Sequence, residues 1–117
     1  MTTRTTSELS KAVMQKLAVI DAMESPSAQD HVMINARYEE LMEGLREENL
    51  AYWDNSTIPL VVFPALTDLV ALHSGSAFGK PLAAVGEIEQ AEMSIKRRIR
   101  RHTHKLSSSA TIYQDDF

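Results

Sequence analysis

The segment that most constrains the fold is 58–78, because it is apolar on nearly every side. Read as a helix, it has one broad apolar face and apolar residues over much of the rest, with Asp68 as its one charge. A helix that is apolar nearly all round is buried on several sides. In a chain of 117 residues, about the size of one domain, it is expected to be the central helix, a subunit interface, or both. Pro59 fits a first turn, and Pro64 either kinks the helix or marks its true start.

Three other segments have the periodicity of amphipathic helices. Ser7 can cap a helix that runs to about residue 20, and Ser27 can cap another that ends near residue 52 or 53. A fourth helix is expected over 82–102. The chain has only four glycines and four prolines, which argues against a turn-rich β-sandwich. We therefore predict an all-α fold: a small four-helix bundle-like domain over 1–106, followed by an extended C-terminal arm over 107–117.

The composition excludes several classes of protein. The chain has no cysteine, which rules out disulfide scaffolds, cysteine zinc fingers and thiol catalysis. The N-terminus has no apolar stretch followed by a cleavage site, so we expect no signal peptide. The most apolar stretch, 58–72, is too short to span a bilayer and holds a charge and two prolines. We expect a protein made in the cytoplasm that has no membrane partner.

Motifs for catalysis or metal binding are incomplete. The segment 74–81 has Gly79-Lys80 but lacks the first glycine and the final hydroxyl residue of a phosphate-binding loop. His102 and His104 point to different faces of a helix and can share a metal only in an extended segment. We expect exposed histidines there, and at His73 a core histidine with a satisfied hydrogen bond. The prediction is of no enzyme activity, no cofactor and no metal site; a small enzyme or metal protein is a minor alternative.

Charge is divided unevenly along the chain, although the net charge is only −4. The face of 27–53 opposite its apolar stripe is acidic, and is either solvated or turned toward a partner or a lumen. It is formed by Glu39, Glu40, Glu43 and Glu47. The end of the fourth helix is basic, and is either solvated or set against phosphates or an acidic protein surface. It is formed by Lys96, Arg97, Arg98, Arg100 and Arg101.

The last eleven residues are rich in hydroxyl groups and carry apolar residues only near their end. On composition they are either disordered or an arm that anchors to a groove or a sheet edge. The candidate contact residues of this arm are Ser107, Ser108, Ser109, Thr111, Ile112, Tyr113, Asp115, Asp116 and Phe117. Within this set, Ile112, Tyr113 and Phe117 are the expected anchors.

The order of these parts resembles the head-to-tail adaptor (connector) proteins of tailed bacteriophages, and most closely the packaged-DNA stabilisation adaptors of short-tailed phages. The resemblance covers about 8–117. In the first half of the chain, the resemblance rests on the opening helix 12–20 and on Arg37-Tyr-Glu-Glu-Leu-Met42, which leads to Tyr52-Trp53. In the second half, it rests on a helix that opens at Ile58-Pro59 and closes at Phe78-Gly79, on the basic fourth helix, and on the tail Tyr113-Gln-Asp-Asp-Phe117. Two positions depart from the family pattern. Ala18 stands where such proteins often have glycine, and Asp68 stands in a stretch that is usually small and apolar.

The resemblance implies a virion structural protein. It implies a homo-oligomeric ring of twelve subunits below the portal protein, which extends the DNA channel, retains the packaged DNA and docks the tail or the next connector. The arm, 107–117, would insert against the portal. The packaged DNA would pass through the channel without sequence-specific contacts.

The residues themselves leave other functions open. The basic fourth helix suits a small helical nucleic-acid-binding or regulatory protein, although no helix-turn-helix turn is recognisable. A generic helical interaction module also fits. The channel-facing side of a ring, and whether the basic helix meets portal, neighbour or DNA, do not follow from the sequence.

Overall fold

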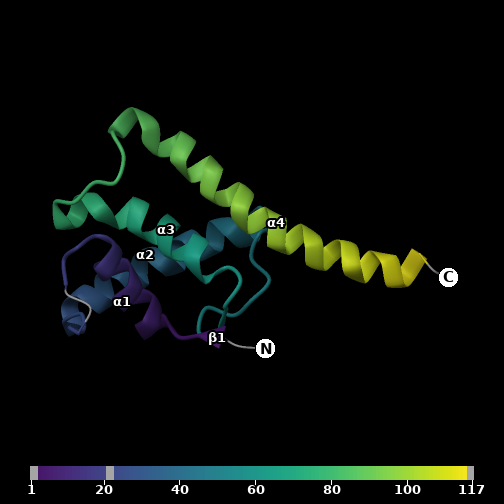
Figure 1. The fold of residues 1–117 in the computed structure, drawn as a ribbon, viewed down its shortest axis with the longest axis horizontal. Helices are drawn as coiled ribbons and strands as arrows, with labels where there is room; N and C mark the ends of the chain where they lie inside the picture. The colour runs from purple at the N-terminus through teal and green to yellow at the C-terminus, as the bar shows by residue number, and fades with distance from the viewer. Residues whose placement is uncertain (1–2, 21–22, 116–117) are drawn as a thin grey trace.

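The structure of the protein, a computed structural model, describes residues 3–20 and 23–115, with side chains described as far as residue 102. This part of the chain is mostly helical, which confirms the all-α prediction (Figure 1). Its elements are β1 (Thr3–Arg4), α1 (Thr6–Lys16), α2 (Ala28–Glu47), β2 (Ile58–Pro59), α3 (Phe63–Ser74), the 3-10 turns η1 (Gly75–Phe78) and η2 (Val85–Glu87), and α4 (Ile88–Asp115).

Helix α3 is the centre of the fold, as its composition predicts. It contacts α1, α2 and α4, and most of its residues are buried. Its core side chains include Leu66, Leu69 and Val70, which are fully buried. The surrounding helices supply the rest of one continuous core, which includes Val13 of α1 and Tyr38 of α2. Because every neighbour packs on α3, this helix sets the position of α4.

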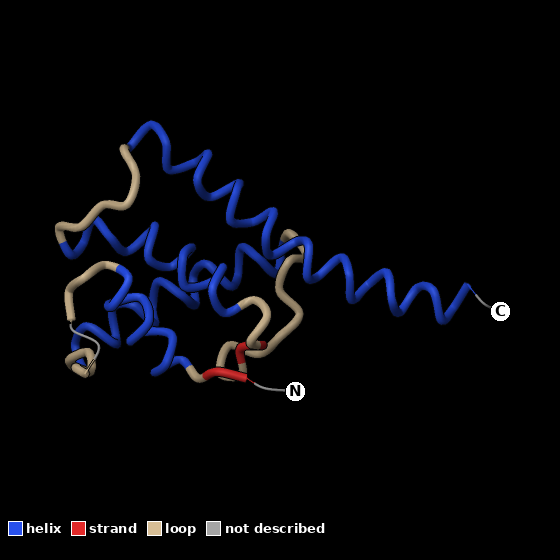
Figure 2. The backbone as a smooth tube through the Cα atoms, in the orientation of Figure 1, coloured by secondary structure: helices blue, strands red, loops and turns tan. Residues whose placement is uncertain are grey.

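The start of α3 lies later in the chain than Pro59. Pro64 occupies its first turn, where a missing N–H costs nothing, so it marks the true start of the helix. Ile58 and Pro59 instead form β2, which pairs antiparallel with β1, so they do not open a helix (Figure 2). The side chain of Ile58 is fully buried, so burial against the body fixes this segment as a strand.

Two left-handed residues end α1 and α2 earlier than the apolar periodicity predicts. Ala18 has φ 58° and Asn49 has φ 60°. After each helix, the two following N–H groups bond back to helix carbonyls. The N–H of Val19 donates to the Met14 carbonyl, and the N–H of Leu50 donates to the Leu45 carbonyl. This pattern is the Schellman motif, which satisfies carbonyls that the last turn leaves free.

Helix α4 corrects the prediction for the C-terminal arm. The segment from residue 107 to Asp115 is a continuation of α4 and is not extended. No glycine or proline interrupts 88–115. Adding a residue to an existing helix fixes one residue per hydrogen bond, whereas nucleation fixes three, so weak helix formers can prolong a helix that has already begun. Asp116 and Phe117 lie outside the described residues.

Candidate interaction surface

Helix α4 joins the body by a short apolar row near its middle. Ile99 is fully buried, and Ile95 is partly buried against the same core. These residues are four apart and share one helix face, which packs on α3. The C-terminal end of α4 extends past the body, as Figure 1 shows. The helix therefore has a docked part and a projecting part.

Asp68 of α3 binds two cations from two other helices. Its Oδ2 accepts from Nη1 of Arg98 in α4 at 2.6 Å, and its Oδ1 lies 2.7 Å from Nζ of Lys16 in α1. Burial alone raises the pKa of Asp68, but the hydrogen bonds from Lys16 and Arg98 outweigh it and hold the pKa below its ordinary value. A lone charge in an apolar helix needs such partners, because unpaired burial of a carboxylate is costly. Asp68 thus links α1, α3 and α4.

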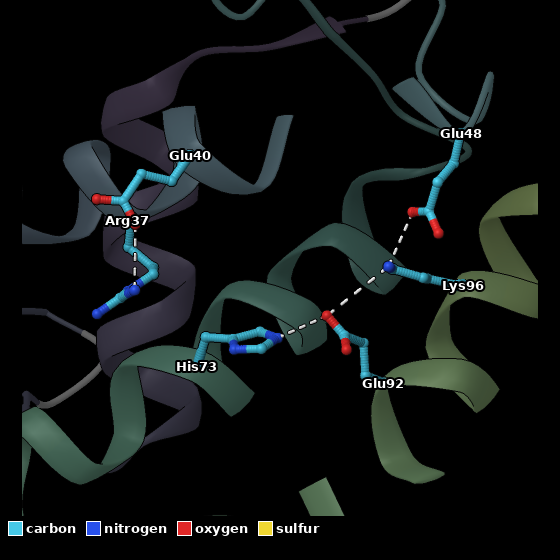
Figure 3. A network of polar contacts seen from close by, with 6 residues as sticks. All are labelled: Arg37, Glu40, Glu48, His73, Glu92 and Lys96. Atoms are coloured by element: carbon cyan, nitrogen blue, oxygen red, sulfur yellow. Dashed lines mark hydrogen bonds and ion pairs between the residues drawn. The ribbon is translucent and has the colours of Figure 1, made fainter. Parts of the chain in front are cut away.

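A second polar cluster joins α4 to α3 and to the residue that follows α2 (Figure 3). His73 of α3 lies 2.9 Å from Glu92 of α4, measured between Nε2 and Oε1. Lys96 of α4 lies 2.8 Å from Oε2 of Glu48, the residue that follows α2. Lys96 also lies 3.8 Å from Glu92, so the four side chains form a chain of alternating partners. His73 is therefore partly buried and partnered, as expected of a satisfied histidine.

These contacts divide the predicted basic run into two groups. Lys96 and Arg98 bind carboxylates of the body. Arg97, Arg100 and Arg101 are exposed, and within the described part of the chain no carboxylate partner is found for them. The sequence predicts the run but does not predict this division. The sequence feature that could have indicated this division is Asp68, the one charge in the apolar helix, because a buried carboxylate needs a cation nearby.

The acidic face of α2 is exposed, as predicted. All four glutamates of this face, Glu39, Glu40, Glu43 and Glu47, are open to solvent. Two of them have partners on their own helix: Glu39 accepts from Asn35, and Glu40 pairs with Arg37 at 3.2 Å (Figure 3). A shallow surface hollow of about 410 Å³ lies beside this face. Arg46 and Asn55, which are hydrogen-bonded to each other, also line the hollow.

A serine and a histidine meet between α1 and α2. The Oγ of Ser10 lies 2.7 Å from Nδ1 of His31, beside a hollow of about 290 Å³ that His31 lines with Lys11 and Ser25. Ser10 is only 1% exposed and does not line the hollow. A substrate in the hollow cannot reach a hydroxyl buried in this way, so the pair serves to join the two helices.

The structure does not test the contacts predicted for the side chains of the arm. The backbone of Ser107 to Asp115 is helical, and its side chains lie outside the described part, as does the side chain of His104.

In the part of the chain that the structure describes, no three histidine or carboxylate side chains are grouped to hold a metal ion. None of its helices combines the length and the apolar character needed to cross a bilayer.

Comparison with known proteins gives no relative. The chain matches no family model, no curated protein and no solved structure. Its function therefore has to be argued from the surfaces described above.

Proposed function

We propose that this chain is a virion structural protein, a head-to-tail adaptor subunit that forms a ring below a phage portal. The observation that most supports this proposal is that α4 continues as a helix past the body on which it packs (Figure 1). The sixteen residues from 100 to 115 extend about 24 Å at 1.5 Å per residue. A projecting element of this kind suits a subunit that joins larger assemblies. In this role the chain carries out no reaction and needs no cofactor.

The charged faces support a ring. A ring uses two different patches on each subunit, because its interfaces are heterologous. The exposed glutamates of α2 and the exposed arginines of α4 lie on different elements and have opposite charge. Such complementary charges favour the correct orientation of neighbours more than they add affinity. In the assembled ring these subunits would line the channel for the packaged DNA and dock the tail or next connector.

The projecting helix is proposed as the portal contact. Its candidate anchors are Ile112, Tyr113 and Phe117, with Asp115 and Asp116 as polar partners. Each helix buries little surface alone, and twelve helices on one ring add their binding through effective concentration. Because residues up to Asp115 are already helical, less backbone entropy is lost on docking than for an extended arm.

The test is portal binding by truncated and substituted chains. Removing 107–117 is expected to abolish sedimentation of the chain with the portal assembly of the same phage. The double variant Ile112→Ala/Tyr113→Ala is expected to weaken this binding, since alanine keeps the helix and removes the anchors. The matched control is Val32→Ala/Met33→Ala, two exposed apolar residues of α2. Normal portal binding by the truncated chain would overturn the proposal.

A second candidate function is favoured by the exposed arginines Arg97, Arg100 and Arg101. Three exposed cations near the C-terminal end of one helix suit the phosphates of a nucleic acid. This function predicts duplex DNA binding that weakens steeply with salt and is reduced in Arg100→Gln/Arg101→Gln but not in Lys80→Gln. A gel shift at low salt that shows no complex excludes it.

A further inference from the structure

We propose that the surface on which α4 packs is also an interface between copies of this chain, in which the α4 helix of one copy docks on the body of another. We call this surface, which includes Glu48, Asp68 and His73, the α4 groove. The proposal adds to the ring described above the segment that joins its neighbours. It rests on three features of α4: how it docks, how it is tethered, and how completely its contacts would be reproduced by a second copy.

The contacts that dock α4 on the body are specific, but they bury little apolar surface. Among the described side chains of α4, Ile99 alone is fully buried. Recognition depends also on charge: Arg98 pairs with Asp68 at 2.6 Å and Lys96 pairs with Glu48 at 2.8 Å. Such a helix recognises one groove in one register, because its apolar residues must enter while both cations meet their carboxylates.

The tether that holds α4 near its own body is exposed. The segment 79–87, between η1 and α4, has eight exposed residues and one intermediate residue. Val85 is 91% exposed and makes little contact with the body, and Leu82, at 44% exposed, is covered only in part. Gly79 has φ 69° and forms the turn that begins the tether. Nine residues reach about 30 Å when extended, which is the largest distance over which the tether can carry α4 to a second body.

Exchange of α4 preserves every docking contact. The α4 of a second copy presents the same isoleucine and the same two cations to the same groove, so only the course of the tether differs. Docking within one chain then prevails at low concentration, and exchange prevails where copies are held close together. If each α4 docks on the next copy in one direction, the interface is heterologous, and it closes into a ring when the rotations between copies add up to a full turn. Reciprocal exchange between two copies gives a dimer.

The experiment uses charge reversal on the full chain without any portal. In Asp68→Arg the groove is positive and α4 is unchanged, and in Arg98→Asp the groove is unchanged and α4 is negative at that position. Each variant alone therefore opposes like charges, both within a chain and between identical chains. In a 1:1 mixture, each groove finds a complementary α4 only on the other variant. The double variant Asp68→Arg/Arg98→Asp restores the pair within one chain and is the matched control for folding.

The expected result is a heterodimer in the mixture, with twice the 13.1 kDa mass of the chain by light scattering and native mass spectrometry. The dimer fraction in the mixture should exceed that of either variant alone by about tenfold, the ratio that ~1.4 kcal/mol of pairing energy gives. A mixture that stays monomeric, while the double variant is folded, overturns the proposal.

A second pair of charge-reversal variants keeps the test valid if Asp68→Arg does not fold. Asp68→Arg also places a cation beside Lys16, so this variant can fail to fold. Glu48→Lys and Lys96→Glu reverse a pair in which Glu48 is 45% exposed, and the same mixing result is expected. If these variants also remain monomeric when mixed, exchange does not occur. Dimers in the mixture together with failed portal binding would instead leave exchange standing and remove the adaptor role.

Discussion

Ala18 is the residue whose conformation least suits its side chain. It has φ 58°, a left-handed conformation that costs an L-residue with a Cβ about 1–2 kcal/mol. Glycine occupies this position at the end of many helices because it has no Cβ. This chain instead places alanine in the left-handed conformation.

Replacing Ala18 by glycine is therefore expected to stabilise the protein. The gain should be about 0.5–1 kcal/mol, since removal of the Cβ relieves the strain and the extra freedom of the unfolded chain offsets part of it. Urea denaturation measures the difference. The control is Ala36→Gly, at an exposed position inside α2, which should destabilise by about 1 kcal/mol. Destabilisation by both substitutions would contradict the assignment of strain to Ala18.

Asp68 makes stability depend on pH. Its pKa is held below the ordinary value because the hydrogen bonds from Lys16 and Arg98 outweigh the effect of burial. A carboxyl whose folded pKa is lowered stabilises the fold above its unfolded pKa, near 4. That contribution is lost as the pH falls through the folded pKa.

Substitution of Asp68 by asparagine should remove this dependence. At pH 7 the variant is expected to lose about 1 kcal/mol, a modest value because both cations are partly exposed. The difference from the unsubstituted chain should shrink as the pH falls below about 4, the ordinary pKa of an aspartate, toward the lower pKa of the folded state. Denaturation series across this pH range test it, with exposed Glu43→Gln as the control. A difference that stays constant with pH would show that the charge of Asp68 is not responsible.

Among the elements, α4 differs most between its two ends. Its docked part is fixed by Ile99 and by ion pairs, and its far part leaves the body. The starts of the helices follow from local signals in part. The Ser27 hydroxyl accepts from the N–H of Asp30, as predicted for α2, whereas α1 is capped by Thr5, two residues before the predicted Ser7. Thr5 and Glu8 form a reciprocal capping box, a pattern that the sequence already contains.

The attachment of α4 is tested by truncating Ile99. Ile99→Ala is expected to cost about 2–4 kcal/mol, because it removes a fully buried side chain from the apolar row that joins the helix to the body. Met93→Ala on the same helix is 52% exposed and should change the free energy of unfolding by less than about 0.5 kcal/mol. Urea denaturation followed by circular dichroism distinguishes them. Equal effects would mean that Ile99 does not anchor α4.

At the scale of the whole molecule, the projecting helix makes the protein elongated. The principal extents are 54 × 33 × 21 Å, and the radius of gyration is 15.3 Å. A compact chain of this length would have a radius of about 13.4 Å. The shape thus separates a helical body from a part that is open to partners.

Small-angle scattering of the monomer checks this shape. The radius of gyration is expected close to 15.3 Å, and removal of 107–117 should lower it toward the compact value. The same truncation should leave thermal stability nearly unchanged, because the buried side chains of the described core lie between Leu9 and Ile99. A radius near 13.4 Å for the full chain would mean that α4 folds back on the body.

The sequence by itself determined the helical class, the central position of α3 and the charged faces of α2 and α4. Each of these follows from periodicity and composition, which are local properties of a segment. The tertiary structure decided where the helices end, because a left-handed residue such as Ala18 leaves no trace in hydrophobic periodicity. It also decided which basic residues of α4 bind Asp68 and Glu48 and which face solvent, because that choice depends on carboxylates far away in the chain. The structure also decided that α4 continues to Asp115. Residues 107–115 have a weak preference for helix by themselves, but they extend a helix that already exists.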